Sequence, residues 1–295
     1  MGLAEMIRDA GVVGAGGAGF PTHIKANSRA DIVLANGAEC EPLLRVDRLV
    51  MQRYPDKIVT GLAAMAEAVG AKEGVLCLKK KYKDAIEALE SAIKDKSNIR
   101  LYLLDNYYPA GDEQQMVYEV TGQVVPTGGI PLDVGAVVCN VSTLMNIADA
   151  IDGKPVTDKY LTVGGEVDRP VTLRVPIGTP YGALIAAAGG PDTLMDHTLV
   201  IGGPATGTLC RDMEETVTKT TGGILVFPSD HPLIRQKTDS GDMDLKLTKA
   251  ACSQCTLCTD MCPRNALGLG VAPHKAMRAA FMGQGSLLGD ANGVF

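Results

Sequence analysis

The first half of the chain alternates between short continuous apolar runs and stretches with apolar residues at helical spacing. The apolar runs lie at residues 31–37, 74–78, 100–104 and 134–140, and each has the length of a buried strand. Helical spacing occurs before, between and after these runs, at residues 3–10, 58–69, 82–93 and 143–151. Strands that alternate with helices of this length predict an α/β layer with a mainly parallel sheet.

The pattern changes after Pro155, where compact strands surround one short helix. This arrangement predicts a small α+β module that ends near residue 230. The stretch 235–246 is polar and poor in apolar residues, so we expect it to be a linker. The pattern therefore divides the chain into three parts, at residues 1–155, 156–235 and 236–295.

Composition excludes some classes of function. The chain has 295 residues, of which 46% are hydrophobic, and a net charge of −6. This charge argues against nucleic acid as a partner, because binding a phosphate backbone needs a basic face. No apolar run reaches the ~18 residues of a membrane span, and the first residues lack the pattern of a secretory signal. We therefore expect a cytoplasmic protein.

Cysteine spacing gives the strongest chemical signal. Four of the eight cysteines lie close together as C-x2-C-x2-C-x3-C-P, at Cys252, Cys255, Cys258 and Cys262. This spacing is typical of a bacterial ferredoxin-type [4Fe–4S] cluster. Zinc sites usually use two separated cysteine pairs, so zinc and redox-active thiols are the weaker alternatives.

The cysteine run leaves one question open. In two-cluster ferredoxins the fourth cysteine of a run serves the other cluster, and no second run follows Cys262. Either Cys262 completes a single cluster, or the second run is missing because the chain is truncated. The final residues, 283–295, carry little pattern, and this favours truncation.

A glycine-rich segment near the start has the G-x-G-x-x-G spacing of a dinucleotide-binding turn, at Gly14, Gly16 and Gly19. That turn needs a strand before it and a helix directly after it. Here a predicted helix precedes the glycines and Pro21 follows them. The flanks therefore favour a phosphate-binding loop, in which Lys25 neutralises the anion. A structural turn without a ligand is the alternative.

Polar clusters follow three predicted strands or loops, at residues 36–42, 108–114 and 140–144. Open α/β sheets bind ligands at the carboxyl ends of their strands. Four acids in the first two clusters would repel a phosphate, so they are expected to accept hydrogen bonds from sugar or ribityl hydroxyls. Solvated turn acids are the alternative. These acids are Glu39, Glu41, Asp112 and Glu113, and the third cluster adds Asn140 and Thr143.

The motifs GAGGAGFPTHIK, NGAECEP, YPAGDE and NVSTL, in this order, resemble the FMN-binding flavin subunit of respiratory complex I. They are more similar to the C subunit of the Rnf ferredoxin:NAD oxidoreductase. PduS-type cobalamin reductases are resembled most by the segments AGVVGAGGAGFPTHIK, LKKKYKDAIEAL, KTTGGILVFP and CTDMCPRNALG. The resemblance implies an FMN-binding Rossmann-like α/β/α domain over 1–155 and an α+β β-grasp (SLBB) domain over 156–235. It further implies a partial, helical ferredoxin-type [4Fe–4S] segment over 236–295.

The resemblance also implies roles for individual residues. It assigns Gly14, Gly16, Gly17, Gly19 and Lys25 to the FMN phosphate, and Asn36, Asp112, Asn140 and Thr143 to the rest of FMN. It places Phe20, Glu39, Glu41 and Glu113 near the nicotinamide nucleotide, with Glu41 and Glu113 as catalytic residues. Two positions depart from the complex I pattern, because Ala38 replaces an acid and Asp112 replaces a glutamate.

These expectations define a flavin- and iron–sulfur-dependent oxidoreductase. NADH would give a hydride to FMN, and FMN would pass single electrons to the [4Fe–4S] cluster and on to a redox partner protein or a cobalamin-processing enzyme. The first alternative is an Rnf-like subunit of a membrane-associated complex, and the second is a non-catalytic electron-relay or docking subunit. Association with a bacterial microcompartment or with the membrane periphery is compatible with these functions.

Overall fold

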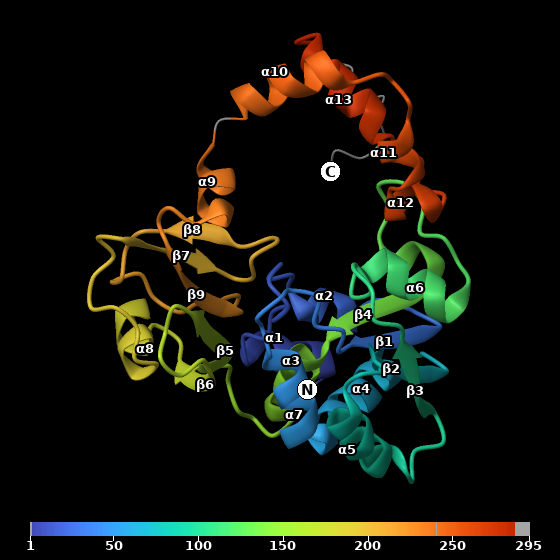
Figure 1. The fold of residues 1–295 in the computed structure, drawn as a ribbon. Helices are drawn as coiled ribbons and strands as arrows, with labels where there is room; N and C mark the ends of the chain where they lie inside the picture. Colours follow the sequence, from blue (N-terminus) through green and yellow to red (C-terminus); the bar gives the residue numbers. More distant parts are fainter. Residues whose placement is uncertain (1, 240, 287–295) are drawn as a thin grey trace. The chain divides into compact units, whose positions relative to one another are not determined.

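The computed structural model describes residues 2–239 and 241–286 (Figure 1). The expectation of an unpatterned carboxyl-terminal end falls mainly on residues 287–295, outside the described residues. Contacts between residues divide the chain into two compact units. The first contains residues 1–111 and 135–237, and the second contains residues 112–134 and 238–295. Both units are interrupted along the sequence, because the chain leaves the first unit once and returns to it.

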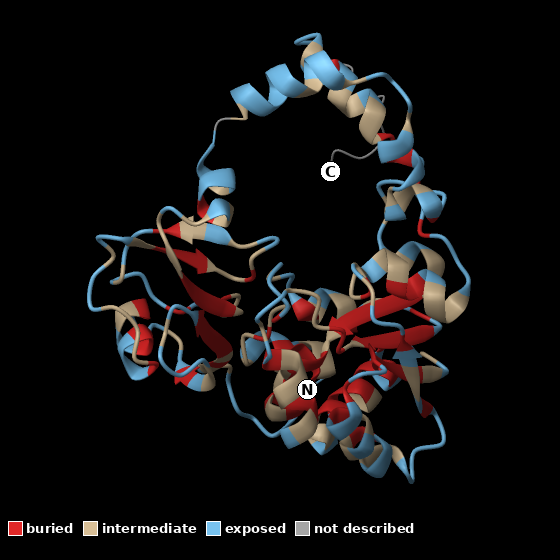
Figure 2. Ribbon diagram, viewed as in Figure 1, coloured by how far each residue is buried: buried red, intermediate tan, exposed pale blue. Residues whose placement is uncertain are grey.

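A parallel sheet with the strand order β3-β2-β1-β4 forms the centre of the first unit. Its strands are β1 (Ile32–Asn36), β2 (Glu73–Lys79), β3 (Ile99–Leu104) and β4 (Ala136–Asn140). β1, β2 and β4 are buried along almost their whole length, as expected for continuous apolar runs covered on both faces (Figure 2). The prediction of an α/β layer with a parallel sheet is confirmed.

Helices cover this sheet and connect its strands. They are α1 (Leu3–Asp9), α2 (Thr22–Ala26), α3 (Val46–Arg53), α4 (Pro55–Val69), α5 (Lys83–Ile93) and α7 (Val141–Ile151). α4 contacts both α5 and α7, so these three helices line one face of the sheet (Figure 1). A Cβ atom on Gly61 of α4 would lie only 2.0 Å from the carbonyl oxygen of Leu144. Glycine therefore permits the close packing of α4 on α7, which holds the first turn of α7 in place.

The β-grasp module of the first unit has a five-stranded mixed sheet with the order β6-β5-β9-β7-β8. Its elements are β5 (Asp158–Gly165), β6 (Val171–Pro176), α8 (Tyr181–Ala187), β7 (His197–Ile201), β8 (Thr208–Cys210) and β9 (Gly223–Pro228). Leu161 and Val163 of β5 pack with Ile185 of α8 in its core. The predicted small α+β module is confirmed.

The second unit is helical, with elements α6 (Glu113–Thr121), η1 (Pro131–Val134), α10 (Asp242–Ala251), α11 (Leu257–Asp260), α12 (Pro263–Ala266) and α13 (Pro273–Phe281). The predicted linker over 235–246 contains the boundary between the two units, which falls between Lys237 and Thr238. This stretch contributes to α9 (Pro232–Thr238) and begins α10. No residue of α10 is buried, so its polar sequence reflects exposure to solvent and not irregular backbone (Figure 2).

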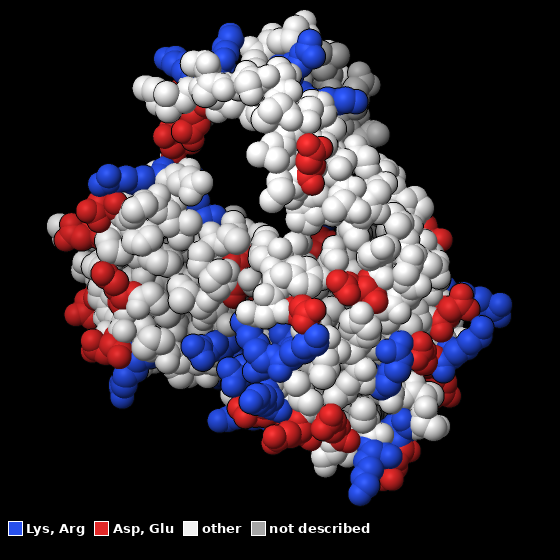
Figure 3. Space-filling view, turned by 45° about the vertical axis from the view of Figure 1, so that its right-hand side comes forward, with Lys and Arg blue, Asp and Glu red and all other residues white. Residues whose placement is uncertain are grey.

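Charged side chains of both signs are spread over the face of the molecule seen in Figure 3. On the face seen in Figure 3, lysine and arginine side chains alternate with aspartate and glutamate side chains over the lower part. In the part of the chain that the structure describes, no helix is long and apolar enough to cross a membrane.

Candidate functional site

The carboxyl ends of β1 and β4 lie side by side at the point where the sheet order reverses. The connection after β1 leads to β2 on one side, while β4 pairs with β1 on the other. Open α/β sheets bind ligands at such a switch point. The register places Asn36 directly opposite Asn140 there. The structure therefore brings together two residues that the sequence assigned to flavin binding.

Both asparagines use their side chains to shape the neighbouring backbone. Asn36 Nδ2 donates to the carbonyl oxygen of Gly111 at 2.9 Å, and its Oδ1 accepts from the Ala38 amide at 3.1 Å. Asn140 Oδ1 accepts from the Ser142 amide at 2.8 Å and so caps α7. A capped helix amino terminus at a sheet switch point provides backbone N–H groups for an anionic ligand.

The glycine loop lies between α1 and α2, so the strand required by a dinucleotide-binding turn is absent from its described flanks. The Gly14 amide donates to the Phe20 carbonyl at 2.8 Å, and the Gly19 amide donates to the Gly14 carbonyl at 3.2 Å. These bonds close the loop on itself. Gly17 and Gly19 have φ angles of 122° and 67°, which glycine adopts without strain.

The loop touches the start of α7. The Ala15 amide donates to Thr143 Oγ1 at 2.9 Å, and a Cβ on Gly16 would lie 3.5 Å from Asn140. Open space surrounds Gly17, because no atom lies within 4 Å of the position a Cβ would take. Ala15 and Gly16 of the loop therefore lie against Thr143 and Asn140 at the start of α7.

Lys25 and Phe20 flank the loop. Lys25 Nζ donates to the carbonyl of Val138 at 2.6 Å and lies 5.4 Å from the centre of the Phe20 ring. The Phe20 side chain is 42% exposed. The lysine is thus anchored to β4 near the switch point, and the aromatic ring is available for stacking on the outer side of the loop.

A group of ionisable residues surrounds Glu39, just after β1. Burial, followed by the charge of nearby Asp47, raises the pKa of Glu39 from 4.5 to about 8. Lys79 Nζ and the Tyr82 hydroxyl donate to the backbone carbonyl of Glu39, at 2.9 and 3.2 Å. Asp47 accepts two hydrogen bonds from Asn140 Nδ2, at 3.1 and 3.0 Å, and burial raises its pKa as well.

Glu41, one of the two residues expected to be catalytic, contacts the SLBB domain. Its carboxylate accepts hydrogen bonds from the backbone amides of Ala205 and Thr206, at 2.9 and 2.8 Å, and from the Thr206 hydroxyl. A Cβ on Gly203 would lie 2.0 Å from Glu41 Oε2, so only glycine fits beside this carboxylate. The SLBB loop therefore fixes the orientation of Glu41.

Asp112 and Glu113 belong to the second unit. The Asp112 side chain caps α6, because its Oδ1 accepts from the amides of Gln114 and Gln115 at 3.0 and 3.1 Å. Its Oδ2 lies 2.5 Å from Nη2 of Arg264. The sequence motifs gave no reason to single out Arg264, which follows the cysteine run.

The four clustered cysteines lie on exposed or partly exposed backbone of the second unit, and all are free thiols. Gln254 and Thr256, which stand between them, have left-handed backbone with φ of 60° and 64°. In the described part of the chain, no group of three or more His, Cys, Asp or Glu side chains is arranged to hold a metal ion. The donor set of four accessible thiols on a short, sharply turning segment is nevertheless the chemistry that a [4Fe–4S] cluster requires.

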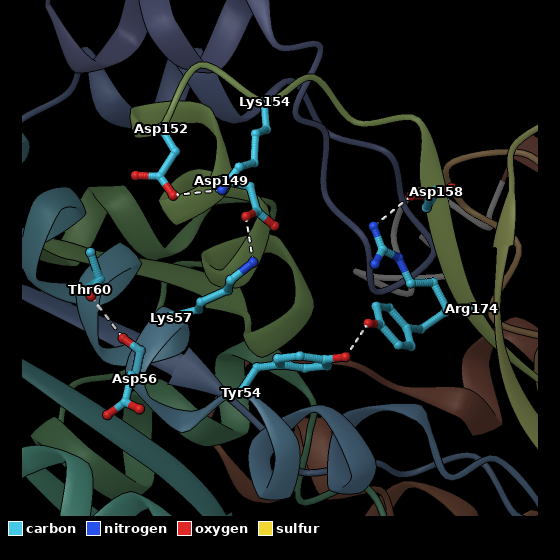
Figure 4. A network of polar contacts seen from close by, with 10 residues as sticks. Tyr54, Asp56, Lys57, Thr60, Asp149, Asp152, Lys154, Asp158 and Arg174 are labelled. Atoms are coloured by element: carbon cyan, nitrogen blue, oxygen red, sulfur yellow. Dashed lines mark hydrogen bonds and ion pairs between the residues drawn. The ribbon is translucent and has the colours of Figure 1, made fainter.

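A polar cavity of about 470 Å³ lies where the SLBB strands meet α4 and α7 (Figure 4). Within it Lys57 pairs with Asp149 at 2.5 Å, and Arg174 pairs with Asp158 at 2.7 Å. The Tyr160 hydroxyl is hydrogen-bonded to that of Tyr54 at 2.8 Å. These cations already have carboxylate partners, so the network stabilises the junction of α4, α7 and the SLBB strands.

Sequence reasoning missed Asp47 and Lys159. Lys159 is only 6% exposed and donates to the carbonyl of Ala15 at 2.7 Å. The sequence does contain a signal that Lys159 is buried. Residues two apart in a strand share a face, so Lys159 lies on the same face of β5 as the core residues Leu161 and Val163. Asp47 carries no such signal, because an acid in the first turn of a helix is ordinary.

Three protein-family models match the chain. The Nuo51 FMN-binding domain matches residues 7–149, the SLBB domain matches residues 160–207, and a 4Fe-4S dicluster domain matches residues 251–293. These matches confirm the predicted resemblance, the fold class and the predicted FMN and [4Fe–4S] cofactors. The four polar motifs and the cysteine run all lie inside the matched segments.

Curated relatives agree with the family models. The chain is 45% identical over 278 residues to the cobalamin reductase PduS of Salmonella typhimurium, covering 94% of this chain and 61% of that protein. It is 35% identical to the C subunit of the Na⁺-translocating ferredoxin:NAD⁺ oxidoreductase complex of Acetobacterium woodii, covering 92% of this chain and 60% of that protein. The chain thus spans less than two thirds of these relatives' length.

A solved structure supports the fold. A chain of an air-oxidized NAD⁺-reducing [NiFe]-hydrogenase superposes with a TM-score of 0.69 at 23% identity, covering 95% of this chain and 54% of that one. At this identity the likeness establishes the fold alone. By sequence the chain is therefore similar to PduS-type cobalamin reductases and to Rnf complex C subunits, and its residues 7–149 match the Nuo51 FMN-binding domain.

Proposed function

We propose that this chain is the flavin and iron–sulfur portion of an NADH-dependent oxidoreductase of the cobalamin reductase type. The observation that supports this most directly is the convergence of the glycine loop, Asn36 and Asn140 at the β1–β4 switch point. The similarity to PduS, a cobalamin reductase, supports a corrinoid as the final acceptor.

The residues at the switch point fit FMN. The glycine loop and the amino terminus of α7 offer backbone N–H groups to its phosphate, and Asn36, Asn140 and Thr143 offer polar groups to the remainder. Asp112 is proposed as a further flavin ligand, and Cys252, Cys255, Cys258 and Cys262 as the thiolate set for the [4Fe–4S] cluster. When bound, FMN exchanges electron pairs with nicotinamide and the cluster carries single electrons.

Four side chains are proposed to act on the nicotinamide side. Phe20 presents an exposed ring on which a nucleotide base can stack. Glu39 holds a proton at its carboxyl group near neutral pH, because its pKa lies at about 8. Glu41 is oriented by the SLBB loop and is proposed to contact the nucleotide together with Glu113.

Anaerobic reconstitution of the purified chain with iron, sulfide and FMN tests this proposal. We expect a visible spectrum with flavin and iron–sulfur bands, roughly four irons for the four-cysteine run and one FMN per chain. Addition of NADH should then bleach the flavin band. One bound zinc without flavin would overturn the proposal, and full FMN occupancy without NADH-dependent bleaching would leave only an electron-relay role.

A second candidate function is that of an Rnf-like subunit, favoured by the similarity to the Acetobacterium woodii protein. The two candidate functions are distinguished by the acceptor to which the NADH-reduced protein passes its electrons. Stoichiometric reduction of a cob(III)alamin or cob(II)alamin supports the first candidate, whereas exclusive exchange with a ferredoxin supports the second. We propose a cytoplasmic location for either, with microcompartment association in the first case and peripheral membrane association in the second.

A further inference from the structure

The β-grasp module, which carries the SLBB match, provides two lysines that hold the glycine loop. Lys159 Nζ of β5 donates to the carbonyl of Ala15 at 2.7 Å, and Lys219 Nζ donates to the carbonyl of Gly11. The chain segment that enters β5 adds a third bond, from the Val156 amide to the Ala10 carbonyl at 2.9 Å. Residues of the β-grasp module thus grip the loop at its start and in its middle.

Lys159 is the more deeply placed of these contacts. It is 6% exposed, and burial lowers the pKa of its ammonium group to about 8 although nearby Asp47 and Glu39 favour the charged form. Asp47 in turn is held by Asn140, the residue that caps α7. The lysine is therefore part of one polar network with the residues at the β1–β4 switch point.

Two hydrogen bonds fix the backbone of the glycine loop at Ala15. Its amide is bound to Thr143 on one side and its carbonyl is bound to Lys159 on the other. A loop can present N–H groups to a phosphate only if its carbonyl oxygens, which would repel the anion, turn elsewhere. The contact with Lys159 fixes the Ala15 carbonyl in such an orientation, directly between Gly14 and Gly16.

We propose that Lys159 is a positioning residue of the flavin site, contributed by the SLBB domain to the phosphate loop of the neighbouring domain. This inference rests on the proposed FMN site. In this arrangement the SLBB domain holds the phosphate loop of the flavin site in its conformation. The loop reaches its binding conformation only when β5 is in place.

The test compares Lys159→Met, which keeps the length of the side chain and removes its charge, with Lys154→Gln as a matched control. Lys154 is an exposed lysine five positions earlier that pairs only with Asp152 among the partners described. FMN affinity is measured from the quenching of flavin fluorescence on binding. Loss of a charge-assisted hydrogen bond is expected to weaken FMN binding by roughly ten- to a hundredfold in Lys159→Met. Lys154→Gln should bind as the parent does.

A second measurement does not depend on flavin. In the flavin-free protein, hydrogen–deuterium exchange of residues 11–20 should be faster in Lys159→Met than in the parent, with β1 and β4 unchanged. Lys159→Arg, which keeps the charge, should restore slow exchange. Equal exchange of the loop in parent and Lys159→Met would overturn the inference, as would equal FMN affinity. If the parent itself binds no FMN, the proposed function fails, while the exchange result still decides whether Lys159 positions the loop.

Discussion

Glu39 and Asp47 place two carboxyl groups near the β1–β4 switch point, and burial raises the pKa of both. Two lysines, Lys79 and Lys159, balance them from β2 and β5. Such a compact group of ionisable side chains holds its members in place only while every partner is present, because an unpaired buried charge is costly. The charge state of the switch point is therefore set by four residues acting together.

The raised pKa of Glu39 makes stability depend on pH. Its pKa is about 8 in the folded chain against an ordinary value of 4.5, so between these values the folded state binds more protons than the unfolded state. The stabilising contribution is complete below the lower value and is lost as pH rises through the higher one.

Glu39→Gln should remove this dependence in the flavin-free protein. Relative to the parent, the variant is expected to gain unfolding free energy as the pH rises from about 4.5 to about 8, by at most about 1.4 kcal/mol per pH unit. Urea unfolding at a series of pH values measures it, with the exposed Glu87→Gln as control. Parallel pH profiles for parent and Glu39→Gln would contradict the assignment.

At the scale of elements, the parallel strands could be predicted because each is a continuous apolar run bounded by polar turns. The glycine loop could be interpreted from the helix before it, α1, although α2 begins directly after Pro21, where the sequence predicted no helix. The polar helix α10 could not be predicted, because it has no buried face and therefore no apolar period in its sequence. Helices of this kind depend on propensity alone, which is a weaker signal than periodic burial.

The residues of the candidate site also divide into those that the sequence could predict and those that it could not. The glycines, asparagines and cysteines stand in local motifs with recognisable spacing. Lys159, by contrast, meets Ala15 across 144 residues of sequence, and its partner is a backbone carbonyl that any residue would provide. Arg264 likewise meets Asp112 across 152 residues. Contacts of this type arise from tertiary packing, so one sequence alone does not reveal them.

The packing of α4 on α7 allows a prediction at this scale. Gly61→Ala would place a methyl group 2.0 Å from the Leu144 carbonyl, so the two helices must separate. We expect a loss of about 1–3 kcal/mol in unfolding free energy and weaker FMN binding, because the first turn of α7 carries Thr143. Denaturant titration measures the first effect. The exposed Ala68→Ser on the same helix is the control, and an unchanged midpoint in Gly61→Ala would contradict the close packing.

At the scale of the whole molecule, one ion pair links two segments of the second unit that are distant in sequence. Arg264 bonds both Asp112 and Gln114, at 2.5 and 3.2 Å, and so ties the segment after the cysteine run to the start of α6. Asp112 is a proposed flavin ligand and Cys262 a proposed cluster ligand. The pair therefore ties the segment that follows the proposed cluster ligands to α6 within the second unit.

Arg264→Met should loosen this connection. Because the arginine side chain is 42% exposed, we expect a modest loss of about 1 kcal/mol or less. Opening of the cysteine-bearing segment should increase severalfold, which limited proteolysis between residues 238 and 286 can measure. Arg278→Met, an exposed arginine on α13, serves as the control. Equal cleavage rates for Arg264→Met and the parent would show that the ion pair does not hold the segment.

The distance along the chain between Ala15 and Lys159 has a consequence for biosynthesis. The two residues are 144 positions apart, and ribosomes add about 5–20 residues per second, so roughly 7–29 s separate their synthesis. During that interval the loop exists without the ammonium group that holds its carbonyl. Flavin capture should accordingly follow translation of β5, which makes it a late step in the maturation of the nascent chain.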